Sequence, residues 1–433
     1  MNICFYIHPF RDRDFWPMAR TALAAGHTLY YGIAGRTSFP EIIAQDGRVP
    51  FDLVISADRV SFESPGDPLH LRLKKKPPLL EVIFNGLIEI VEGHRGHNGG
   101  FDHLEEHGIT LGIMDPELLD VCAAIGLRHT VLVPYGIPRF RFSQPDFFIR
   151  RLGRRAYGVL TPADLQREEG RVRFLSRISH RLAGNATKRK SVDLVFLGEC
   201  KLATNPILLE SIRARYFPGQ SPVWLAGLDA RARAEFDASP PRTAGEVAML
   251  TSDFLKSVQD DPQTRIGKAL IAEHILHQFR TARRLRYVRH LQAAFGRRLW
   301  LYGDDFRRLG LDARPSSHDA TETKFLRARI AMDFGSNSYA ASLYTRPVRI
   351  IYCDALLLQL RQPDARGVFG KLASEMTFSS PEQMVAQVSS FLNARPRRES
   401  TSAALRELGT TAVGMDHALV TVFDALNLKA GSV

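Results

Sequence analysis

Residues 1–33 read MNICFYIHPFRDRDFWPMARTALAAGHTLYYGI, and this stretch contains the pattern that decides the fold. A buried strand is predicted over Asn2–Ile7. A helix over about Phe15–Ala25 follows, and Gly26 stands in the position of its C-cap. A second strand, Thr28–Gly32, begins at once. Strands that alternate with helices in this way predict crossover units and a parallel sheet.

The same alternation continues along the chain. Further strands are predicted at Phe51–Ser56, Leu80–Phe84, Thr110–Ile113 and Thr130–Pro134, and later at Val192–Gly198, Arg298–Tyr302, Ile330–Phe334 and Ala355–Leu360. Between about residues 221 and 295 the pattern is mainly helical, with the longest amphipathic helix at Ala269–Phe295. The predicted fold class is therefore α/β, with two Rossmann-like parallel-sheet domains facing a cleft and a helical insertion in the second half.

The domain boundary is predicted at the polar, basic stretch Asn185–Lys190. An N-terminal domain is expected over residues 1–188 and a C-terminal domain over residues 189–400. Residues 401–433 are predicted as C-terminal helices, with a return to the N-terminal domain as one arrangement they allow.

The chain is basic: 58 Lys and Arg stand against 46 Asp and Glu, a formal charge of +12. Such a surface attracts anions, including nucleotide phosphates. The excess is spread out, without a continuous stripe or interleaved aromatic residues, so no nucleic-acid partner is predicted. The 4 cysteines form no C-x-x-C pair, which predicts buried thiols rather than a zinc site or a disulfide framework.

The cellular location is predicted as cytoplasmic. The first ten residues lack the basic region and long apolar run of a signal peptide. No apolar run approaches the ~20 residues of a membrane span. Any contact with a membrane is therefore expected to be peripheral. The oligomeric state stays open.

The candidate ligand site lies in the second half. Ligands of parallel sheets bind outside the carboxyl ends of the strands, so the residues to consider are those that follow each strand. These are Gly198–Lys201, Gly303–Phe306 and Gly335–Tyr339. Glycine lets backbone N–H groups approach a ligand, and a helix N-terminus offers partial positive charge to a diphosphate. The run Gly335–Tyr339 fits either a diphosphate cradle or an ordinary capped turn.

Several blocks of the second half resemble one family. LRYVRHLQAAFGRRLWLYGDDF (residues 285–306) and ETKFLRARIAMDFGSNS (residues 322–338) resemble the donor half of the CgeB-like, spore maturation protein type group of GT-B glycosyltransferases. The likeness covers roughly residues 190–430. It implies a nucleotide-sugar donor as co-substrate, bound by the second domain, and transfer of the sugar to a hydroxyl of a glycan, lipid or protein. It also implies that no bound metal or tightly bound cofactor is needed, because basic side chains and helix dipoles stabilise the leaving diphosphate.

The run YTRPVRIIYCDALLLQLRQPD (residues 344–364) departs from the family pattern. Arg346 matches the family's arginine, but the glutamate that binds ribose hydroxyls in the family is Arg349 here, and the family's glycine is Asp354. Because a cation accepts no hydrogen bonds, the resemblance implies either an unusual donor or a loss of transferase activity. Arg346 and Arg349, three residues apart, either clamp a phosphate or carboxylate or are two solvated arginines.

The first half is expected to supply the acceptor site and a general base. The catalytic candidates follow the first strand or lie in a glycine-rich loop: His8, Asp12, His94 and His97. His94 and His97 with Glu92 lack a further ligand, so no metal site is predicted. The candidates for donor binding are Gly198, Lys201, Tyr302, Gly303, Ser336, Asn337, Ser338, Tyr339, Arg346 and Arg349.

Three functions remain compatible with the sequence. The first is the metal-independent glycosyltransferase that the resemblance implies. The second is a nucleotide-sugar epimerase of the GT-B type. The third is a non-catalytic GT-B relative that binds a glycan or a partner protein, which Arg349 and Asp354 favour.

Overall fold

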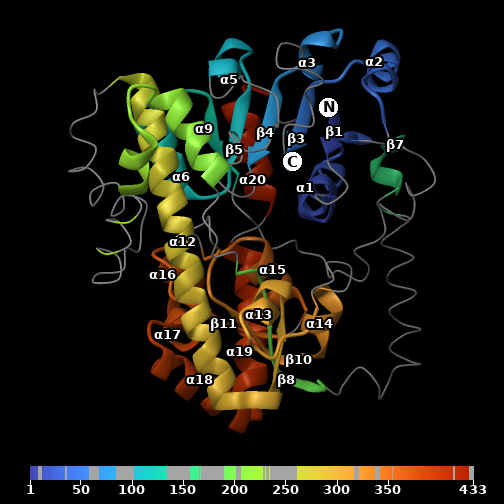
Figure 1. Ribbon diagram of the computed structural model, residues 1–433. Coiled ribbons are helices and arrows are strands. Elements are labelled where there is room, and N and C mark those ends of the chain that lie inside the picture. The colour runs from blue at the N-terminus through green and yellow to red at the C-terminus, as the bar shows by residue number, and fades with distance from the viewer. Residues whose placement is uncertain are drawn as a thin grey trace. The chain divides into compact units, whose positions relative to one another are not determined.

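The computed structural model describes residues 1–7, 12–34, 37–57, 68–83, 102–133, 157–164, 166, 190–200, 206–227, 230, 234, 261–315, 321–336, 342–353, 355–412 and 415–428. The chain divides into two compact units (Figure 1). The first unit is Met1–Gly184 together with Gly414–Val433, and the second is Asn185–Val413. The segment after residue 413 therefore belongs to the first unit, whereas residues 401–413 belong to the second.

The first unit contains a seven-stranded sheet in the order β6-β5-β4-β3-β1-β2-β7. The strands are β1 (Asn2–Ile7), β2 (Thr28–Ile33), β3 (Leu53–Ala57), β4 (Leu79–Ile83), β5 (Thr110–Ile113), β6 (Thr130–Leu132) and β7 (Tyr157–Leu160). Neighbouring strands are parallel except for β7, which pairs antiparallel with β2 at one edge. The helices are α1 (Asp12–Ala24), α2 (Phe39–Arg48), α3 (Leu69–Arg72), α5 (Asp102–Glu106), α6 (Pro116–Ala124) and α20 (Met415–Ala425).

The core of the first unit forms around its first strand. The Phe5 ring packs edge-on against Phe15 of α1 and stacks on Tyr31 of β2. Gly26 has a φ of 86°, the left-handed conformation expected of the residue that ends α1. The last helix of the chain, α20, packs against α1 and β6, and its Phe423 ring lies 5.3 Å from the ring of His27.

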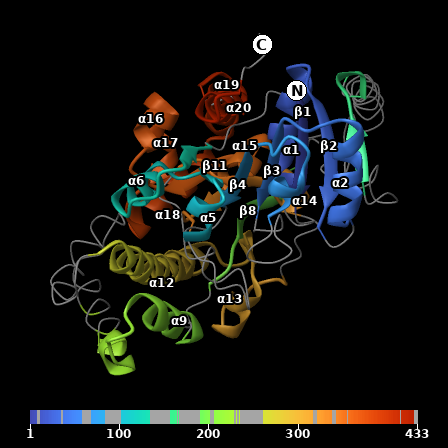
Figure 2. The ribbon, with the colours of Figure 1, turned by 90° about the horizontal axis from the view of Figure 1, so that it is seen from above.

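The second unit contains a five-stranded parallel sheet in the order β12-β11-β10-β8-β9. The strands are β8 (Val192–Leu197), β9 (Leu299–Tyr302), β10 (Ala328–Asp333), β11 (Leu356–Leu360) and β12 (Thr377–Phe378). The α-helices are α9 (Pro206–Tyr216), α12 (Pro262–Phe295), α13 (Asp304–Arg308), α14 (Thr321–Arg327), α15 (Thr345–Tyr352), α16 (Ala365–Phe369), α17 (Ala373–Met376), α18 (Pro381–Asn393) and α19 (Arg395–Ala412). Helix α12 covers one side of this sheet and α19 the other (Figure 2).

Helix α12 is the longest element, with 34 residues. It begins two turns before the predicted start, because Asp261 caps it: the Asp261 carboxylate accepts from the backbone N–H groups of Gln263 at 2.9 Å and Thr264 at 3.0 Å. Pro262 occupies the first turn, where no N–H donor is required. The helix ends at Gly296, which has a φ of 49° and is the predicted end.

The α/β class with two parallel-strand sheets is confirmed, and each predicted strand is present. All four cysteines are buried and free, as expected of thiols that form no disulfide framework. Within the described ranges, every helix is too short or too polar to cross a bilayer.

Candidate functional site

Two glycines bring the ends of β8 and β9 into backbone contact. Gly303, directly after β9, has a φ of 151°, and a Cβ atom on it would lie 2.3 Å from the carbonyl oxygen of Gly198. Gly198, directly after β8, donates its N–H to the carbonyl of Tyr302 at 3.2 Å. Only glycine fits at position 303, because any Cβ there would meet the Gly198 carbonyl and the Phe306 ring.

Gly303→Ala is expected to lower the free energy of unfolding of the second unit by about 2–3 kcal/mol, because it combines backbone strain with a clash against the Gly198 carbonyl. Gly310→Ala is the matched control: Gly310 also has a positive φ, 78°, but nothing lies within 4 Å of its added Cβ. The control should cost only about 1 kcal/mol. Equal losses in urea unfolding would show that the Gly198–Gly303 contact does not form.

Arg284 joins the ends of β8 and β10 from helix α12. Its Nη1 donates to the carbonyl of Glu199 at 2.7 Å, and its Nη2 donates to the carbonyl of Gly335 at 2.6 Å. The side chain is 3% exposed, and its Nε has no partner among the described residues. Burial, together with the neighbouring charge of Arg346, lowers the pKa of Arg284 to about 10. The guanidinium therefore stays charged at neutral pH.

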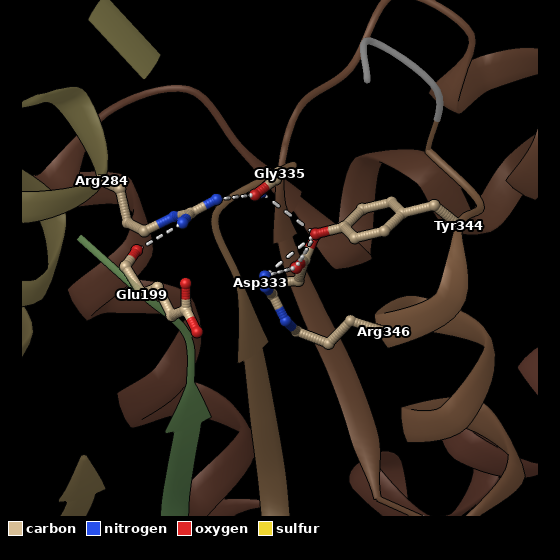
Figure 3. A network of polar contacts seen from close by, with 6 residues as sticks. All are labelled: Glu199, Arg284, Asp333, Gly335, Tyr344 and Arg346. Atoms are coloured by element: carbon tan, nitrogen blue, oxygen red, sulfur yellow. Dashed lines mark hydrogen bonds and ion pairs between the residues drawn. The ribbon is translucent and has the colours of Figure 1, made fainter. Parts of the chain in front are cut away.

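Asp333, the last residue of β10, is 1% exposed and ties three groups together (Figure 3). Its Oδ1 accepts from the Tyr344 hydroxyl and from Nη1 of Arg346, the latter at 2.8 Å. Its Oδ2 accepts from the N–H of Gly335 at 3.1 Å. Burial raises the pKa of Tyr344 well above its ordinary value, so the hydroxyl remains a donor. One carboxylate thus fixes both the turn after β10 and the start of α15.

The buried groups of the cluster include two cations and one carboxylate. Arg284 and Arg346 contribute two guanidinium groups, and Asp333 contributes one buried carboxylate. The exposed carboxylate of Glu199 also acts on this cluster, since it helps to raise the pKa of Arg346. The Arg346 side chain is 20% exposed, and within the described part of the chain only its Nη1 donates a hydrogen bond. Its Nε–Nη2 edge therefore makes no hydrogen bond to a described residue. A partly desolvated guanidinium with an edge that makes no hydrogen bond attracts an anion.

The structure brings together several of the residues predicted from the sequence. Gly198, Tyr302, Gly303, Ser336 and Arg346 all lie at the carboxyl ends of β8, β9 and β10, or at the helix that follows β10. Tyr302 is 8% exposed, and Nζ of Lys324 lies 4.5 Å from its ring centroid. Arg349 lies one turn beyond Arg346 on α15 and is partly exposed.

The other predicted residues are not placed. Asp12 is the first residue of α1, but its side chain lies outside the description. The remaining positions also fall outside the described residues: His8, His94, His97, Lys201, Asn337, Ser338 and Tyr339. Across the described ranges, no three His, Cys, Asp or Glu side chains group as metal ligands would.

Three residues of the cluster are missing from the sequence prediction: Arg284, Asp333 and Tyr344. A signal existed for Arg284, since it precedes Val288 by four residues and Leu291 by seven on the apolar stripe of α12. An arginine on such a stripe requires buried acceptors. Asp305, in the first turn of α13, reaches the end of β8, where its Oδ2 accepts from the N–H of Cys200 at 3.2 Å.

Comparisons with known proteins give only distant structural likeness. No protein-family model matches the chain, and no curated protein matches it. A solved structure of phage T4 BGT in complex with UDP and Mn²⁺ aligns over 99% of this chain and 100% of that chain, at 10% identity and a TM-score of 0.47. The D-to-A mutant of T4 phage BGT with UDP-glucose gives 9% identity and 0.46, over 99% and 100% of the two chains. A structure of the DNA modifying enzyme β-glucosyltransferase gives 8% and 0.44, with the same coverage. Likeness of this extent assigns neither an activity nor a ligand to this chain.

Proposed function

We propose that the chain is a glycosyltransferase of the GT-B type that takes a nucleotide-sugar as co-substrate. The observation that carries the proposal is the pair of largely buried guanidinium groups, Arg284 and Arg346, of which Arg346 is held by Asp333 through Nη1 alone. It lies at the carboxyl edge of a parallel sheet, where such sheets bind their ligands. The narrower assignment to the CgeB-like group rests on the sequence blocks between residues 190 and 430.

Arg346 would hold the donor's diphosphate. Asp333 occupies Nη1 at 2.8 Å, which orients the guanidinium and leaves its Nε–Nη2 edge for two phosphate oxygens. Positive charge fixed at this point would stabilise the diphosphate as it leaves, without a bound metal. Ser336 and the undescribed residues Asn337, Ser338 and Tyr339 would add hydroxyl and amide contacts. A base from the first unit, drawn from His8, Asp12, His94 and His97, would take the proton of the acceptor hydroxyl.

A thermal-shift series with UDP-, GDP-, CMP- and dTDP-sugars tests the proposal. One nucleotide class should stabilise the protein, by about 2.7 kcal/mol at a ligand concentration of 100 Kd. Arg346→Met should weaken binding at least about tenfold, because the charged hydrogen bonds to phosphate are lost. Arg307→Met is the control, since Arg307 is 55% exposed on α13 and, among the residues that the structure describes, its ion pair is with the exposed Asp304 at 3.9 Å. Its nucleotide-dependent shift should equal that of the wild type.

The outcomes separate the alternatives. No shift with any nucleotide would contradict the proposal and favour a non-catalytic relative, in which the ion pair between Arg346 and Asp333 is purely structural. Binding that is equal in Arg346→Met and wild type would remove Arg346 from the donor site. Turnover of the donor to an isomeric sugar without acceptor would identify an epimerase rather than a transferase.

A further inference from the structure

The opposite, amino-terminal edge of the second sheet carries a concentration of arginines. Asp193, near the start of β8, accepts from Nε of Arg298 at 2.7 Å and from Nη1 of Arg329 at 2.5 Å. Arg327, just before β10, donates from its Nε to the hydroxyl of Ser191 at 3.2 Å. Three arginines from two separate segments therefore meet at the ends where β8, β9 and β10 begin.

A fourth arginine extends this group along the edge strand β9. Two guanidinium groups lie over the ring of Trp300, with Cζ of Arg314 at 3.8 Å and Cζ of Arg327 at 5.1 Å from its centroid. We call Arg298, Arg314, Arg327 and Arg329 the amino-edge basic surface. All four are substantially exposed, for example 53% for Arg298 and 41% for Arg329.

The amino-edge basic surface is poorly neutralised. Among the described residues, Asp193 is the one carboxylate in contact with its four guanidinium groups, which leaves a net charge of about +3. Further positive charge, on Lys190, Arg398 and Arg406, lies near this surface. The pKa of Lys190 is lowered to about 8 by burial, to which Arg406 and Arg398 add. Arg329 in turn contributes to the lowered pKa of Arg398, after burial. Clustered charge of one sign is a cost unless an anionic partner offsets it.

We propose that the amino-edge basic surface docks the protein on a membrane surface rich in anionic phospholipid. Leu326, between Lys324 and Arg327, is 53% exposed, and an exposed apolar side chain among cations suits the boundary between headgroups and acyl chains. The contacts of Trp300 argue against single-stranded nucleic acid, because two arginines already lie over the ring on which a base would stack. Docking by this edge leaves the carboxyl edge of the sheet open to a soluble ligand.

Sedimentation with vesicles of phosphatidylcholine alone, or with 30 mol% phosphatidylglycerol (about one lipid in three), tests the surface. The wild-type chain should bind only the anionic vesicles and should be released by about 0.5 M NaCl, where exposed charges are screened. Arg314→Glu with Arg327→Glu should weaken binding at least about 100-fold, since the surface loses four units of charge. Arg314→Lys with Arg327→Lys keeps the charge and should stay within about threefold of wild type. Leu326→Ser should weaken binding by about fivefold.

The control is Arg366→Glu with Lys371→Glu. These two exposed residues lie in the segment between β11 and β12, at the opposite end of the strand order from β9. This variant makes the same change of charge and should bind vesicles within about threefold of wild type. The proposal is overturned if wild type ignores anionic vesicles, or if this control loses as much binding as the charge reversal. Binding of a labelled DNA duplex that depends on Arg314 and Arg327, without vesicle binding, would reassign the surface to nucleic acid. Thermal unfolding of each variant verifies folding, and a nucleotide-dependent shift measured in parallel tests the donor site separately.

Discussion

Asp333→Ala is expected to lower the free energy of unfolding of the second unit by about 3–5 kcal/mol. The Asp333 carboxylate is 1% exposed and accepts from Arg346, Tyr344 and Gly335. Without it, the Arg346 charge loses its counterion and the buried Tyr344 hydroxyl loses its acceptor. Leaving one partner of a buried ion pair alone costs more than the pair itself contributes. Urea unfolding followed by circular dichroism measures the loss.

A double-mutant cycle shows whether the cost comes from the ion pair. Asp333→Ala combined with Arg346→Met should cost less than the sum of the single changes, by at least about 1 kcal/mol, because the second change removes the stranded charge. The exposed pair Arg395–Glu399, at 2.7 Å, provides the control, since Glu399→Ala should cost less than about 1 kcal/mol. If Asp333→Ala costs no more than Glu399→Ala, the network in Figure 3 is not formed in solution.

Arg284→Met is expected to cost about 3–4 kcal/mol. Methionine preserves the apolar contacts of the side chain, but two hydrogen bonds from a charged donor are lost, each worth about 1.5–3 kcal/mol. The carbonyls of Glu199 and Gly335 are then left without this donor. Removal of one of two neighbouring buried cations offsets part of the loss. The change in the urea midpoint, at a constant slope, measures the remainder.

Arg286→Met separates this effect from a general loss of helix stability. Arg286 lies on the same helix, two residues after Arg284, and is exposed. Its substitution should change stability by no more than about 0.5 kcal/mol. A similar cost for both substitutions would mean that Arg284 does not hold the ends of β8 and β10 together.

The local sequence pattern was sufficient to predict most of the strands. The run Val192–Leu197 is apolar and β-branched and ends at a glycine, and it forms β8 as predicted. Two strands were missed for identifiable reasons. β7 (Tyr157–Leu160) is four residues long, pairs antiparallel at a sheet edge and lies in a basic segment. β12 (Thr377–Phe378) has two residues, too few for any periodicity. Both depend on a neighbouring strand rather than on their own sequence.

The candidate site divides in the same way. The positions of Gly198, Gly303 and Arg346 follow from a rule about strand ends, which a sequence pattern can apply. The partners of Arg346 cannot be predicted from that rule. Asp333 is the final residue of a buried strand. Its local sequence does not show whether it forms an ion pair with an arginine or is simply a polar residue at the end of the strand. Arg284 bonds Gly335 across 51 positions of the chain.

By itself, the sequence determined that this is an α/β protein of two parallel sheets and that a ligand site should lie after the strands of the second. Those features depend on periodicity and turn chemistry, which act between residues close in the chain. Only the tertiary structure decided that Arg346 faces Asp333, that Arg284 crosses from α12, and that four arginines meet at the other edge. Such contacts arise from the packing of segments that lie far apart in the chain. For Arg284 and for the pair of Arg346 with Asp333, burial makes the free energy of each contact large.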